Sequence, residues 1–148
     1  MPATPELVAE LMRKRRSVFP KTYNKTPIPR AIIEEMLENA NWAPTHRMTE
    51  PWRYKVFMGN ALVRLGEFLG DFYRNNVPPD EFSEAKHKKS MESPVRSACV
   101  IAICMKRDAT GSVPEWEELA AVACAVQNIW LTCTAHGIVS YWSNDIQR

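Results

Sequence analysis

Three consecutive residues, Arg15, Arg16 and Ser17, are the part of the sequence best suited to bind an anion. Arg guanidinium groups donate paired hydrogen bonds to phosphate oxygens, and a Ser hydroxyl adds a further donor to the same anion. The adjacent basic residues Arg13 and Lys14 leave a second interpretation open, because a run of charge is most often a solvated face. The segment therefore predicts either a phosphate site or an exposed basic turn.

A rigid aromatic loop, residues 42–52, is the second candidate. It carries Trp42, His46 and Trp52 between a predicted helix and a predicted strand, and it contains two prolines. Such a loop can present a fixed wall to a planar ligand. Tryptophans beside prolines are more often packed in a core, so this alternative also stays open.

Four helices and three strands are expected to position these segments. Apolar residues at helical spacing, with capping residues and prolines at the ends, predict helices over residues 5–15, 29–42, 61–74 and 114–136. Short apolar or alternating runs predict strands over residues 54–58, 98–105 and 138–142, the second of them covered on both faces. The polar segment 75–93 is expected to be exposed and partly helical over residues 81–88.

The predicted helix 114–136 is apolar nearly all round, which favours a position between two layers or two subunits. No Asp, Glu, Lys or Arg occurs between Glu118 and Asp145, so a membrane span is the competing interpretation. Polar residues such as Gln127 and Asn128 interrupt the run, and Gly137 ends it. We therefore expect a buried helix in a protein that does not span a membrane.

Composition narrows the class of protein. A chain of 148 residues with a net charge of +2 predicts one domain and argues against a dedicated nucleic-acid binder. The four cysteines contain no C-x-x-C pair, so we expect reduced, buried thiols, and no metal site is predicted. His87 lies in a basic run and is expected on a solvated face. The N-terminus lacks a basic start followed by an apolar stretch, which predicts a cytoplasmic protein.

Taken in order along the chain, these segments resemble the nitroreductase family of FMN enzymes. The resemblance rests on Arg-Arg-Ser after the first helix, on Ile28-Pro29 opening the second, on Trp42-Ala43-Pro44 with Pro51-Trp52 before a strand, and on the Ala-rich stretch 117–128 before Gly137. It implies an α+β fold with a central, mostly antiparallel sheet flanked by helices. It also implies a homodimer through the long central helix, with FMN bound in the interface.

The resemblance further implies a set of cofactor-binding residues: Arg15, Arg16, Ser17, Trp42, His46, Trp142, Ser143 and Asn144. The first three match the segment that grips the FMN phosphate and ribityl chain, the next two the loop that reaches the flavin from the other subunit, and the last three the segment beside the isoalloxazine. No protein catalytic residue is implied. The chain departs from the family pattern at Phe19, Met48 and Glu50, where many members carry polar or basic flavin contacts.

The activity implied is hydride transfer from NADH or NADPH through flavin N5 to a nitroaromatic, quinone or similar small acceptor, by a ping-pong mechanism. Two alternatives stay open: a flavin-binding protein of this fold without reductase activity, and another flavin-dependent reaction such as dehalogenation. Family members continue beyond the point that matches Arg148, so the single domain 1–148 is expected to be incomplete at its C-terminus. The sequence does not specify the physiological acceptor, the preferred nicotinamide, or whether residues 75–93 form a lid.

Overall fold

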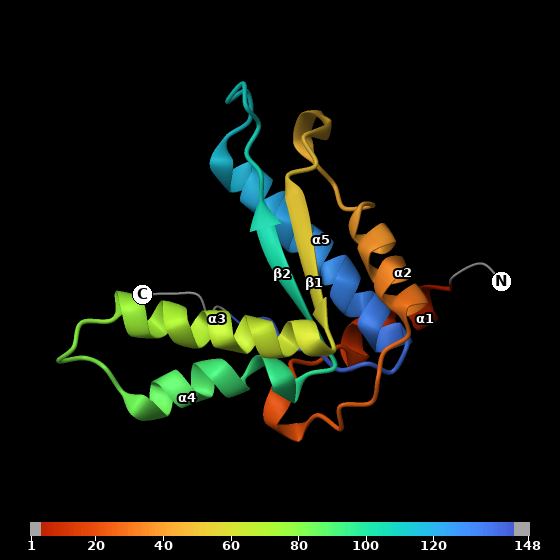
Figure 1. Cartoon of the computed structure of the whole chain (residues 1–148). Coiled ribbons are helices and arrows are strands. Elements are labelled where there is room, and N and C mark those ends of the chain that lie inside the picture. Colours follow the sequence, from red (N-terminus) through yellow and green to blue (C-terminus); the bar gives the residue numbers. More distant parts are fainter. Residues whose placement is uncertain (1–3, 144–148) are drawn as a thin grey trace. The chain divides into compact units, whose positions relative to one another are not determined.

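The computed structural model describes residues 4–143, which form two compact units. Of these residues, the first unit comprises 4–18, 28–55 and 103–140, and the second comprises 19–27, 56–102 and 141–143. Figure 1 labels the helices and strands along the chain.

The first unit is built on α1 (Pro5–Lys14), α2 (Arg30–Ala40) and α5 (Glu115–Ala135). Thr4 caps α1 by accepting a hydrogen bond from the Leu7 amide, as the Thr-Pro start predicted. The long helix α5 packs against α2 (Figure 1). Small side chains at the contact let the two helices approach closely. The buried core of the unit is Ala40, Ala43, Trp52, Ala121, Val122, Ala125 and Val126.

Polar contacts fix the register between α2 and α5. The Asn39 side-chain amide donates to the Thr132 hydroxyl at 3.0 Å, and the Asn128 amide donates to the Asn39 carbonyl at 3.0 Å. The buried Trp52 donates its indole N–H to the Asn41 side chain at 2.9 Å. The Trp-containing loop is therefore partly core, as one of the two interpretations predicted.

Strands β1 (Trp52–Met58) and β2 (Cys99–Met105) pair with each other. The Lys106 amide donates to the Pro51 carbonyl at 2.8 Å, so the end of β2 lies beside the start of β1 and the pairing is antiparallel. Two expectations were wrong in this region. No residue of β2 is fully buried, and Cys104 is exposed. Among the cysteines, only Cys133 is buried.

The strand predicted over residues 138–142 is also wrong. Among the described residues, the segment contributes one isolated parallel bridge, between Ser140 and Ser17. The apolar pair Ile138 and Val139 has high strand propensity, but propensity yields a strand only where a partner strand is available. The sheet of the described residues accordingly has two strands.

The second unit contains α3 (Asn60–Asn76) and α4 (Glu84–Glu92), which pack side by side (Figure 1). α3 turns Leu62, Gly66 and Gly70 inward. His87 of α4 is only 5% exposed and lies against aromatic rings, so its predicted solvated position was wrong. The glycines of α3 explain the difference, because they let α4 come close enough to cover the imidazole.

Candidate functional site

The Arg15–Ser17 segment leaves the end of α1 and runs beside Ser140. The Arg15 amide closes the helix by donating to the Leu11 carbonyl at 3.1 Å. Ser17 forms the parallel bridge with Ser140, and the Val18 amide donates to the Ser140 carbonyl at 3.1 Å. The backbone thus holds the Arg-Arg-Ser segment next to the stretch that leads into Trp142.

Arg15 faces the protein. Its guanidinium carbon lies 4.5 Å from the ring centroid of Trp130 on α5, which is a cation–π contact. The Arg15 Nη1 atom is buried and has no hydrogen-bond partner among residues 4–143. A buried donor without an acceptor is costly, and an anion bound at this point would supply the missing acceptor.

Arg16 has a different environment. Its side chain is exposed, and Nη1 donates to the Arg15 carbonyl at 2.9 Å and also to the Arg13 carbonyl. These carbonyls belong to the C-terminal end of α1, where a cation is favourable. The two neighbouring arginines are therefore not equivalent: Arg16 caps a helix, and Arg15 presents an unpaired buried donor.

Two residues absent from the predicted set share this environment. The Trp130 Nε1 and Ser140 Oγ atoms are buried and, within the described part of the chain, have no hydrogen-bond partner. Trp130 fits the helical spacing of core residues, so the sequence contained no signal that separated it from them. Tyr54 Oη is a fourth such atom, on β1 beside the core, where burial raises the pKa of its hydroxyl to about 12.

The turn after α5 places Ser140. Gly137 adopts a left-handed conformation with φ of 68°, and the Ile138 amide donates to the Cys133 carbonyl at 2.8 Å. Burial raises the pKa of the Cys133 thiol. The Ser140 hydroxyl lies near the Cys133 sulfur and opposes part of this rise in pKa. The Ser140 oxygen has no hydrogen-bond partner among the described residues.

The loop that carries Trp42 and His46 reaches the other end of α5 through His46. Trp42 is 79% exposed, and His46 Nδ1 lies 2.6 Å from Glu117 Oε2 in the first turn of that helix. Trp130 follows Glu117 by thirteen residues in the same helix, which is about 20 Å at the rise of an α-helix. One chain therefore does not bring the His46 loop and Arg15 together.

The remaining predicted residues lie outside the first unit. Trp142 and Ser143 are exposed residues of the second unit, and Asn144 lies outside the described residues. The second unit also contains the ring contact between Phe19 and Tyr141, whose centroids are 4.7 Å apart. Phe19, one of the departures from the family pattern, therefore packs on the residue that precedes Trp142.

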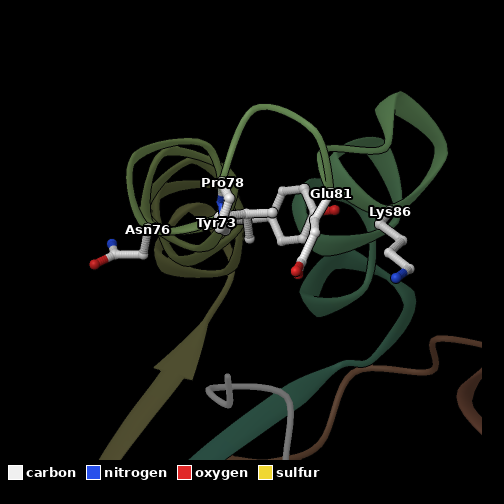
Figure 2. A pocket seen from close by; sticks show the side chains of 6 residues that line it. Tyr73, Asn76, Pro78, Glu81 and Lys86 are labelled. Atoms are coloured by element: carbon white, nitrogen blue, oxygen red, sulfur yellow. The ribbon is translucent and has the colours of Figure 1, made fainter.

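A separate cavity of about 450 Å³ lies at the turn between α3 and α4. Figure 2 shows the Tyr73 ring extending from α3 toward Glu81. None of the predicted cofactor residues lines it; its walls are Tyr73, Asn76, Val77, Pro78, Glu81 and Lys86. It is therefore not the predicted flavin site.

Within the described residues, no group of three or more His, Cys, Asp or Glu side chains could hold a metal ion. α5 is long and apolar enough to cross a membrane by length and composition, but the core helix of a soluble protein meets the same criteria. Its Ala121 and Ala125 side chains are buried in the first unit.

Residues 12–148 match the sequence model of the Nitroreductase family. A Bacillus subtilis protein named "Putative NAD(P)H nitroreductase YfhC" is 27% identical over 97% of this chain and 75% of its own length. A nitroreductase-like family protein from Bacillus cereus has a crystal structure with a TM-score of 0.76 at 26% identity, covering 97% of this chain and 73% of that one. This likeness confirms the predicted α+β fold.

A second similar structure is that of the FMN-dependent nitroreductase NfnB from Mycobacterium smegmatis in complex with NADPH. Its TM-score is 0.68 at 19% identity, with 89% of this chain and 72% of that chain covered. At this identity the comparison supports the fold.

Proposed function

The chain belongs to the nitroreductase family, and from this premise we propose that it is an FMN-dependent oxidoreductase with NADH or NADPH as reductant. Bound FMN would supply the redox chemistry, taking hydride from the nicotinamide at N5 and delivering it to a nitroaromatic, quinone or similar acceptor in a ping-pong cycle. The similarity to an FMN-dependent nitroreductase crystallised with NADPH supports the choice of cofactors.

The buried, unpaired Nη1 of Arg15 is the observation that carries this proposal. A phosphate group offers the acceptors that this donor lacks, and the chain around Arg15 is held in place through Ser17 and Ser140. In this arrangement Arg15 and Ser17 bind the FMN phosphate end. We assign the contacts with the isoalloxazine ring to Trp142, Ser143 and Asn144, which follow Ser140 in sequence.

The homodimer is the second part of the proposal. Trp116, Leu119 and Cys124 are exposed on α5 at helical spacing, and Trp116 and Leu119 are 69% and 59% exposed. A two-fold axis across this face would pair two copies of α5 antiparallel. The Trp42 and His46 end of one subunit would then lie beside the Arg15 end of its partner, which supplies the contact that one chain cannot make.

Replacing Leu119 by Glu should convert the dimer to a monomer and lower FMN occupancy, because a charge would be buried against the partner's α5. Light scattering after size-exclusion chromatography gives the mass, and the ratio of flavin to protein absorbance gives the occupancy. Val63→Glu changes a residue of α3 that is 49% exposed and serves as the matched control. If Leu119→Glu remains a dimer with full FMN, the proposed interface is wrong.

The purified protein should be yellow, and its visible flavin absorbance should bleach when NADH or NADPH is added without oxygen. A colourless protein that also fails to take up added FMN would exclude the enzyme. A yellow protein that neither nicotinamide reduces would favour a flavin-binding protein without reductase activity. Reoxidation by added nitroaromatics or quinones then tests the acceptor class.

A further inference from the structure

We propose that Trp130 and Ser140, together with Arg15, form the phosphate-binding site. The inference rests on the proposed function, because it assigns these residues to the phosphate of FMN. The indole N–H of Trp130 and the hydroxyl of Ser140 are direct donors to the anion. Trp130 also holds the Arg15 guanidinium in position.

Contacts and helical spacing relate the three side chains within the first unit. The Arg15 guanidinium lies over the ring of Trp130. Trp130 and Cys133 are three residues apart in α5 and so lie on the same face of the helix. The Ser140 hydroxyl lies near the Cys133 sulfur, and Ser140 is bridged to Ser17, two residues after Arg15.

All three side chains have a buried polar atom that lacks a partner among the described residues: Arg15 Nη1, Trp130 Nε1 and Ser140 Oγ. Guanidinium and indole N–H groups only donate, and a hydroxyl is able to donate. Leaving several buried donors unpaired is costly unless a ligand rich in acceptors binds to them. A phosphate group fits this requirement, because its oxygens accept several hydrogen bonds and its negative charge offsets that of Arg15.

The cation–π contact leaves the hydrogen-bonding edge of Arg15 available. The ring of Trp130 attracts the face of the guanidinium, whereas the N–H groups of Arg15 point outward in its plane. Trp130 thus has two separable contributions, one from its ring and one from its N–H. Phe at this position keeps an aromatic face but removes the donor, and Leu removes both.

The test compares FMN with riboflavin, which lacks the phosphate, by titrating each into the apoprotein and following flavin fluorescence. Trp130→Phe and Ser140→Ala should each raise the Kd for FMN about tenfold, the usual effect of losing one hydrogen bond to a charged group. Trp130→Leu should raise it further. The Kd for riboflavin should change less than about twofold in all three variants.

Ser112→Ala is the matched control, because the Ser112 amide and hydroxyl both donate to Asp108 in the loop before α5 rather than to Arg15, Trp130 or Ser140. It should leave both Kd values unchanged. Circular dichroism checks that every variant is folded. Equal weakening of FMN and riboflavin, or no change for FMN, would overturn the assignment.

Inorganic phosphate gives a readout that does not depend on flavin binding. Phosphate at tens of millimolar should raise the melting temperature of the wild-type apoprotein, and Trp130→Phe and Ser140→Ala should reduce that rise. If the protein binds neither FMN nor riboflavin, the proposed function is wrong. The anion site is still supported if phosphate raises the melting temperature of the wild type and if Trp130→Phe and Ser140→Ala reduce that rise. A response equal in all variants would contradict the site even if FMN binds.

Discussion

Gly66→Ala should lower the free energy of unfolding of the second unit by about 2–3 kcal/mol. A Cβ at this position would lie 2.2 Å from the backbone carbonyl oxygen of Met91, so α4 would have to move away from α3. The substitution otherwise favours an α-helix by up to about 1 kcal/mol, so the clash must outweigh a gain in helix propensity. Urea denaturation followed by circular dichroism measures the difference.

Gly70→Ala provides the matched control in the same helix. Its added Cβ would meet the Met91 side chain, 2.4 Å from Cγ, and the His87 Nε2 at 3.3 Å. Met91 is 41% exposed and its side chain is flexible, so it can move at much smaller cost than a backbone carbonyl. Equal destabilisation by the two variants would show that the backbone approach at Gly66 does not limit the packing of α3 on α4.

Local signals in the sequence predicted most helices. Thr4-Pro5 placed the start of α1 and Pro29 that of α2, because capping and proline preferences act within a few residues. Burial on α5 was harder to predict. Ala121 is buried and Leu119 is exposed, and the sequence did not indicate this difference, since a helix that is apolar nearly all round does not specify which side meets the core.

Contacts between distant residues were the part that local patterns did not predict. His87 has charged neighbours in sequence, yet tertiary packing against Tyr73 and Phe82 buries it. The pair Gly66 and Gly70, four residues apart in a helix, was the available signal for a close approach. His46 binds Glu117 across 71 residues of sequence, and no local pattern indicates this pair.

The residue types in the sequence suggested a candidate site but not how its side chains differ in environment. Arg15 and Arg16 are the same residue type, and the sequence does not show that Arg16 caps α1 whereas Arg15 lies over the ring of Trp130. Trp130 belongs to a helical apolar pattern, and Ser140 to a predicted strand that does not form. Their unpaired polar atoms depend on how α1, α5 and the turn after α5 come together, which is a property of the fold.

The different environments of Arg15 and Arg16 lead to the largest expected effect on cofactor binding. Arg15→Ala should raise the Kd for FMN about 100-fold, or about 2.7 kcal/mol, because it removes a buried charge-assisted donor to the phosphate. Arg16→Ala should raise it less than about threefold, since Arg16 is already hydrogen-bonded to the end of α1. Arg15→Lys should lie between them, because an ammonium keeps the charge but not the planar fork over Trp130.

Fluorescence titration with FMN and with riboflavin distinguishes binding of phosphate from general loss of structure. For Arg15→Ala the Kd for riboflavin should stay close to that of the wild type, so the preference for the phosphorylated flavin should largely disappear. For Arg16→Ala the preference should remain, while helix α1 becomes slightly less stable. If the two alanine variants lose FMN affinity equally, both arginines contact the phosphate and the capping role of Arg16 does not persist when the cofactor is bound.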